Sequence, residues 1–135
     1  MLKLIIGVKG TGKTKTLINM VNTSSSESSG DVVCMEKGVK LRYEVKPKVR
    51  LINTEEYHVA DATALYGFVA GIFASNHDVT DLYIDAALKI CNNDLVAFDK
   101  FINETSVLAE KLDVNIVVTA SIPVEEASET VKKYL

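Results

Sequence analysis

Short apolar runs alternate with longer segments of helical apolar spacing along this chain. The runs are rich in β-branched residues, as expected for buried strands. The expected strands are residues 2–6, 31–35, 79–85 and 114–120. The expected helices are residues 14–22, 62–75 and 93–112, and a last helix from Pro123 to the end of the sequence. This alternation predicts an α/β fold with three layers, α/β/α, and a mainly parallel sheet.

Three segments depart from simple alternation. Residues 23–30 are Ser-rich with one charge, which predicts a loop. Residues 37–50 hold six cations against Glu44 alone, and their apolar residues alternate with charged ones, which predicts a basic β-hairpin with one exposed face. Residues 62–75 are apolar nearly all round, so we expect Asp61 to cap a buried helix there.

Length and composition narrow the class of protein. The 135 residues predict a single domain, 1–135, and the net charge of −3 argues against a surface built to bind nucleic acid or anionic lipid. Cys34 and Cys91 have no metal-ligand spacing, so a zinc site or a disulfide scaffold is not expected. The apolar runs are too short for a signal peptide or a membrane span, so we expect a cytoplasmic protein.

Residues 7–14, GVKGTGKT, fit the pattern G-x-x-x-x-G-K-[ST] at every fixed position. Glycines let backbone N–H groups turn toward phosphate oxygens, and the N-terminus of the following helix favours the same anion. The Lys13 ammonium suits the β- and γ-phosphates of a nucleotide, and the Thr14 hydroxyl suits Mg²⁺. The expected nucleotide-binding residues here are Gly7, Gly10, Thr11, Gly12, Lys13 and Thr14.

A second acidic element should lie at the end of a buried strand to hold Mg²⁺ through a water. Asp85 follows the apolar residues 82–84 and fits this role; the alternative is a turn or helix-capping residue. Asp81 stands at the start of the same strand, at the opposite edge of the sheet, where we expect a solvated turn residue.

With the glycine motif and Asp85, the sequence resembles the P-loop NTPases, matching their Walker A and Walker B elements. More narrowly it resembles short bacterial ATP-binding proteins of unknown function, often labelled twitching-motility proteins, although the motifs of a twitching motor are absent. The resemblance implies a central phosphate-loop strand, with nucleotide at the carboxyl ends of the strands. It also implies a strand between the first and the Asp85 strand that ends in a γ-phosphate sensor, Thr119 or Ser121; alternatively Ser121 caps the last helix.

The sequence departs from fast P-loop ATPases. Ala86 stands where many of them carry a Glu that orients the attacking water, so we expect at most slow hydrolysis. The candidate catalytic residues are Lys13 and Glu36; Glu36 is either a base for a substrate hydroxyl or an exposed acid at a strand end. Arg42 and Arg50 are either arginine fingers acting on another subunit or part of a solvated hairpin face.

The sequence therefore predicts a Mg²⁺-dependent ATP-binding protein that is at most a weak ATPase. A non-enzymatic nucleotide switch and a small-molecule kinase using Glu36 are the alternatives. Residues 37–50 would either dock an acidic protein partner, a second copy of the chain or a phosphate backbone, or keep a sheet edge from aggregating.

Overall fold

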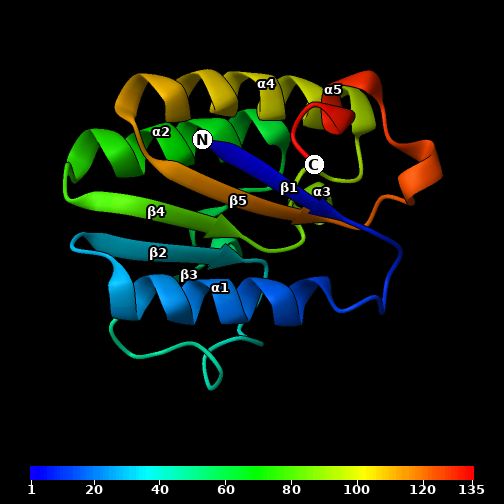
Figure 1. The fold of residues 1–135 in the computed structure, drawn as a ribbon. Coiled ribbons are helices and arrows are strands. Elements are labelled where there is room, and N and C mark those ends of the chain that lie inside the picture. Colours follow the sequence, from blue (N-terminus) through cyan, green and yellow to red (C-terminus); the bar gives the residue numbers. More distant parts are fainter.

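The computed structural model describes residues 1–135, and its sheet of five strands lies between layers of helices (Figure 1). The strands are β1 (Leu2–Ile6), β2 (Asp31–Glu36), β3 (Arg50–Asn53), β4 (Val79–Ile84) and β5 (Asn115–Ala120). The helices are α1 (Lys13–Glu27), α2 (Ala62–Ser75), α3 (Ala87–Ile90), α4 (Leu95–Leu112) and α5 (Glu129–Lys132), with short 3₁₀ helices η1 (Thr54–Tyr57) and η2 (Val124–Glu126). The α/β class is confirmed.

All the strands are parallel, in the order β1-β5-β4-β2-β3. The large arrowheads in Figure 1 therefore point to one side, and the loops that follow the strands gather at that edge of the sheet. Strand β5 lies between β1 and β4, as the resemblance implied. Strand β1 is at the edge of the sheet, so the expected central position is wrong.

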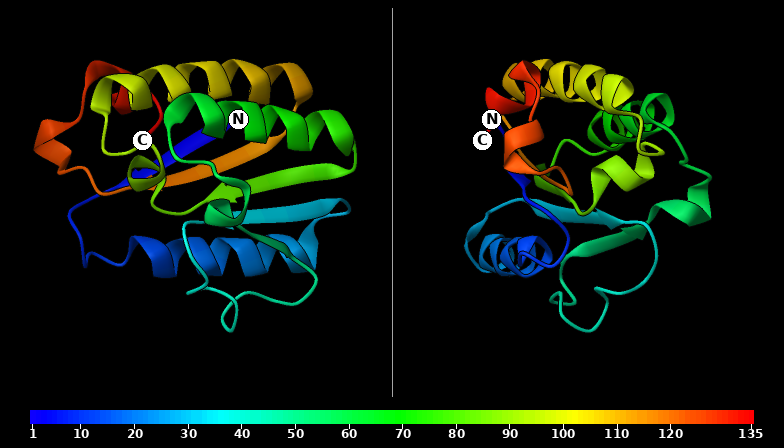
Figure 2. Two further views of the ribbon diagram at one scale, coloured as in Figure 1. Left: turned by 180° about the vertical axis from the view of Figure 1, so that it is seen from behind. Right: turned by 90° about the vertical axis from the view of Figure 1, so that its right-hand side faces the viewer.

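The two faces of the sheet are covered unequally. Helices α2 and α4 cover one face, where strand residues such as Leu82 and Ile116 contribute to the larger apolar core (Figure 2). Helix α1 lies on the other face, where Leu17 and Val21 pack with strand residues such as Tyr83. Because neighbouring strand residues point to opposite faces, the apolar strands fill both cores.

Helix α1 continues to Glu27, well beyond the predicted end at residue 22. Residues 23–27 of the Ser-rich stretch are helical because their side chains find partners there, whereas residues 28–30 form the predicted loop. The hydroxyl of Ser24 hydrogen-bonds with that of Tyr83 on β4, Ser25 is buried, and Ser26 Oγ donates to the Asn22 carbonyl at 3.2 Å. Tertiary contacts thus override the weak helix preference of serine.

The predicted basic hairpin is wrong. Residues 37–49, here called the basic loop, form turns, and only residues 50–53 make a strand, which pairs in parallel with β2. Leu41, Val45 and Val49 are buried in the α1-side core, whereas Tyr43 is 86% exposed. The Leu41 carbonyl accepts the amides of Glu44 and Val45, at 2.9 and 3.0 Å, so the apolar residues recur every four positions rather than every two.

Two further helices differ from expectation. Asp61 caps α2 as predicted, since its Oδ1 accepts the Ala64 amide at 2.8 Å, but only one face of α2 is buried. The expected last helix is interrupted, and Ser128 rather than Ser121 caps α5. No helix combines the length and the apolar character needed to cross a bilayer.

The tight approach at Gly30 generates a stability prediction. A Cβ there would lie 2.3 Å from Thr80 Cγ2 and 2.5 Å from the Asp78 carbonyl oxygen. Gly30→Ala should therefore lower the free energy of unfolding by about 1–3 kcal/mol through overpacking. The control is Gly67→Ala in α2, where a Cβ meets nothing within 4 Å. That variant should raise the free energy of unfolding by about 0.5–1 kcal/mol. Urea unfolding midpoints measure both, and a stabilised Gly30→Ala would contradict the packing described here.

Candidate functional site

The glycine loop, residues 7–14, joins the end of β1 to the start of α1. Gly12 precedes the helix in the left-handed conformation, with φ of 84°, which strains residues that carry a Cβ. At Gly7 an added Cβ would lie 2.7 Å from Thr11 Oγ1, so the loop is closely folded on itself. Thr11 Oγ1 donates to the Val8 carbonyl at 2.7 Å. Glycine is thus required at specific points of this loop.

The Lys13 side chain folds back over the glycine loop. Its Nζ donates to the Val8 carbonyl at 2.9 Å, and no carboxylate lies within 4.0 Å of it. The ammonium is therefore held by one main-chain oxygen, and its charge is available to an anion that enters the pocket.

Asp85 is the centre of a network that joins three segments. Its carboxylate oxygens accept the Thr14 hydroxyl at 3.2 and 3.1 Å, and its Oδ1 accepts the Thr119 hydroxyl at 2.8 Å. Thr119 Oγ1 in turn accepts the Ala86 amide at 2.8 Å. Asp85 is only 9% exposed. The fold thus brings together the residues expected to hold Mg²⁺, Thr14 and Asp85, and the candidate sensor Thr119.

Ala86 occupies an unusual backbone conformation directly after Asp85. Its φ of 52° and ψ of 48° lie in the left-handed region, which costs about 1 kcal/mol or more for a residue with a Cβ. The hydrogen bond to Thr119 holds the Ala86 amide, and α3 begins at the next residue. The turn directs the chain away from the strand and leaves the Asp85 carboxylate facing Thr14.

Glu36 is buried at the end of β2, 4% exposed, so the expected exposed strand-end acid is wrong. Its Oε1 accepts the Lys40 amide at 3.1 Å and its Oε2 accepts the Leu41 amide at 3.0 Å. Burial raises the pKa of Glu36, the two amides oppose this, and the nearby Asp85 charge raises the pKa further. Glu36 anchors the basic loop.

The glycine loop, the strand ends and the basic loop enclose a pocket of about 420 Å³, a size typical of small-molecule sites. Gly10, Gly12, Lys13, Thr14, Glu36, Asp85, Thr119 and Ser121 line the pocket, whereas Gly7 and Thr11 do not. Its apolar lining residues are Leu41, Ala86 and Leu88, so no aromatic ring lines the pocket. The pocket favours a highly charged ligand.

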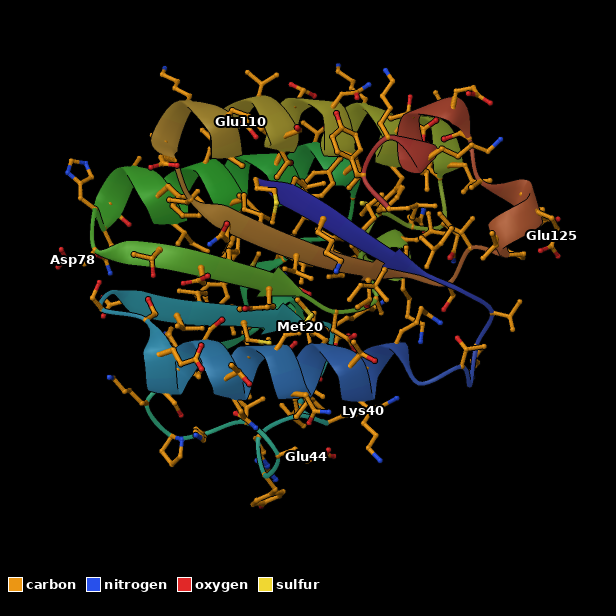
Figure 3. The ribbon with its side chains drawn as sticks, viewed as in Figure 1. Met20, Lys40, Glu44, Asp78, Glu110 and Glu125 are labelled. Atoms are coloured by element: carbon orange, nitrogen blue, oxygen red, sulfur yellow. The ribbon has the colours of Figure 1, made fainter.

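Six lysines line this pocket: Lys9, Lys13, Lys15, Lys37, Lys40 and Lys89. Sequence reasoning placed Lys37 and Lys40 on a hairpin and overlooked Lys89, although Lys89 follows Asp85 by only four residues. Lys40 lies by the end of α1 that follows the glycine loop, while Glu44 lies farther out on the basic loop (Figure 3). The positive charge of the pocket therefore comes from more than the glycine loop.

Arg42, Arg50 and Asp81 lie outside this pocket. Arg42 and Arg50 are exposed and line a separate cavity of about 260 Å³, with Arg42 stacked 4.9 Å above the Tyr43 ring. Asp81 is buried, 8% exposed, and accepts the Thr80 hydroxyl at 2.8 Å, so the prediction of a solvated turn residue is wrong.

The donor atoms at Asp85 fit a hard cation. No cluster of three or more His, Cys, Asp or Glu side chains could hold a metal ion. Mg²⁺, however, is commonly bound by one or two carboxylates together with phosphate oxygens and water. The Asp85 carboxylate and the Thr14 hydroxyl are oxygen ligands of this kind, about one hydrogen-bond length apart.

No protein-family model and no curated protein matches this sequence.

The raised pKa of Glu36 predicts a pH dependence of stability. The Glu36 carboxyl of the unfolded chain has a pKa near 4.5, and folding raises this pKa. Between the two pKa values the folded form therefore binds more protons than the unfolded form. The contribution of Glu36 to the free energy of unfolding must then fall as pH rises above 4.5 through the folded-state pKa. Glu36→Gln lacks this titration, so the stability difference, parent minus variant, should shrink as pH rises.

Urea unfolding of both proteins from about pH 4 to pH 7.5 measures this difference. Glu104→Gln, at an exposed position of α4, is the control and should show no such trend. A stability difference that widens with pH would contradict the assignment.

Proposed function

We propose that this chain is a Mg²⁺-dependent ATP-binding protein of the P-loop class, with at most slow hydrolysis of ATP. The observation that carries the proposal is the contact of Thr14 with Asp85, residues 71 positions apart that meet at the mouth of the glycine loop. In a P-loop site these two residue types share the magnesium ion. Their approach supports this function independently of the sequence pattern.

Each residue has a role that follows from its position. Backbone N–H groups of the glycine loop and the N-terminus of α1 would bind phosphate oxygens, and the Lys13 ammonium would leave the Val8 carbonyl for the β- and γ-phosphates. Thr14 and Asp85 would hold Mg²⁺, which when bound neutralises charge on those phosphates. Thr119 fixes the Asp85 carboxylate by a hydrogen bond.

The residues of the pocket offer no free base to activate a water molecule for attack on the γ-phosphate. Glu36 and Asp85 are the acids that line the pocket. Each Glu36 oxygen already accepts a backbone amide, and Asp85 is engaged with Thr14 and Thr119. No arginine lines the pocket. This arrangement supports tight binding and slow turnover, and it weakens the alternative of a kinase that uses Glu36 as base.

A nucleotide switch is the second candidate function. It is favoured by the two attachments of the basic loop. Glu36 fastens the loop at the pocket, while on α1 the Asn22 amide donates to the Glu44 carbonyl at 2.9 Å and its Oδ1 accepts the Lys46 amide at 2.9 Å. A change at the phosphates could thereby be transmitted to the exposed Tyr43 at the tip of the loop.

Lys13→Ala should weaken ATP binding at least about tenfold, or 1.4 kcal/mol. The variant removes the cation that folds over the glycine loop and leaves the neighbouring phosphates to backbone dipoles. Isothermal titration calorimetry with ATP and Mg²⁺ measures the affinity. Lys100→Ala, an equal loss of charge at an exposed position of α4, should bind like the parent. Equal affinity of Lys13→Ala and the parent would overturn the proposal.

Hydrolysis by the isolated chain should be slower than about 1 s⁻¹, below the median of about 10 s⁻¹ for enzymes. An arginine finger supplies about 10³–10⁵ in rate, and the pocket has no arginine. Phosphate release by dilute, monomeric protein measures the rate. Turnover above that limit would show that an unrecognised base acts in the pocket. A rate per chain that rises with protein concentration and falls in Arg42→Ala or Arg50→Ala would indicate a finger from a second copy.

A further inference from the structure

Three of the pocket lysines lie outside the glycine loop and the start of α1. Lys37 and Lys40 follow β2, and Lys89 lies on α3 after β4. The other three, Lys9, Lys13 and Lys15, lie within or directly after the glycine loop, and Lys13 is the one assigned to the proposed triphosphate site. Lysines that follow β1 therefore line one part of the pocket, and lysines that follow β2 and β4 line another.

None of these lysines forms an ion pair within the chain, although the Lys40 charge acts on the nearby Glu36 carboxyl and opposes the rise of its pKa. The ion pairs of the structure are Met1 with Glu110 and Lys132 with Glu129, and neither involves a pocket residue. Six lysines and two acids line the pocket, a formal excess of four positive charges. ATP with Mg²⁺ carries roughly two negative charges at neutral pH, so about two positive charges remain.

The backbone that carries the additional lysines is held in place. The buried Glu36 carboxylate accepts the amide of Lys40 itself, and the Lys89 amide donates to the Ala86 carbonyl at 3.1 Å. The far end of the basic loop is fastened to α1 through Asn22. Like charges repel, so a fold that orders unpaired cations around one pocket is suited to an anion that binds between them.

We propose that Lys37, Lys40 and Lys89 form a second anion site beside the triphosphate site, for a small molecule that carries a phosphate monoester. Lysine ammonium groups bind phosphate as point charges, whereas carboxylate recognition favours the planar fork of arginine, which is absent from the pocket. The open volume shared by the two sites favours a small ligand. This proposal depends on the proposed function in one respect: the ligand of the neighbouring triphosphate site is taken to be ATP.

The test uses inorganic phosphate as the probe. The chain is first saturated with Mg²⁺ and a non-hydrolysable ATP analogue, so that the triphosphate site is filled. Phosphate is then titrated at constant ionic strength against sodium chloride, and binding is followed by amide chemical shifts and by the melting temperature. We expect saturable shifts at residues 37–41 and 86–93, and an additional rise of the melting temperature.

Lys40→Ala should weaken phosphate binding about tenfold while the affinity for the ATP analogue changes less than threefold. Lys48→Ala removes a charge from the same loop outside this pocket and should bind phosphate like the parent. Both residues are exposed, so both variants should fold. Loaded protein that binds no phosphate, phosphate that merely displaces the analogue, or equal binding by Lys40→Ala and the parent would each overturn the second site.

Failure of the proposed function gives a different result. If the ATP analogue does not bind, phosphate is titrated against the free chain. Binding that is lost in Lys40→Ala and retained in Lys13→Ala would still support the second site. Binding lost in Lys13→Ala and retained in Lys40→Ala would overturn it.

Discussion

The Asp85 carboxylate is the interaction on which the site depends. It accepts hydrogen bonds from Thr14 at the start of α1 and from Thr119 on β5, and it follows the last residue of β4. Since each of these elements begins or ends at the same edge of a parallel sheet, one short side chain can join them. The glycine loop is held against the strand ends by this contact. The candidate phosphate-binding groups and the candidate magnesium ligands therefore line one pocket rather than separate parts of the surface.

A second buried carboxylate organises the other side of the pocket. Glu36 is largely withdrawn from solvent, and this raises its pKa, yet two backbone amides partly compensate the cost. Because Glu36 binds the amides of Lys40 and Leu41, the chain turns directly after β2, and Lys40 lies in the lining of the pocket. Removing an acid that anchors a loop has a different consequence from removing a catalytic base, since its effect should appear first in stability and in the order of the basic loop.

The electrostatics of the pocket favour phosphate chemistry more than recognition of a base. Lysines surround the strand ends, and the apolar lining is limited to Leu41, Ala86 and Leu88. An anion bound in such a pocket would obtain its affinity mainly from charge, and salt screens interactions of this kind. The acids of the pocket are both hydrogen-bonded, and no arginine is present. These features agree with the proposed function, the binding of a nucleotide with slow turnover.

The sequence by itself determined the α/β class, most strand positions and the glycine loop, because these depend on local periodicity and on residues whose conformational demands are strict. The tertiary structure alone decided the edge position of β1, the helical state of the Ser-rich stretch and the path of the basic loop. Ser24 is helical because Tyr83 lies opposite, and Leu41 and Val45 are buried because α1 lies there. The sequence indicated Glu36 as a strand-end acid at the site, but its burial and its bonds to the Lys40 and Leu41 amides depend on the path of the chain after β2. Lys89 was overlooked because it reaches the pocket only when the strands align. Contacts between residues far apart in the sequence determine these features, and the periodicity of apolar residues along the chain does not report such contacts.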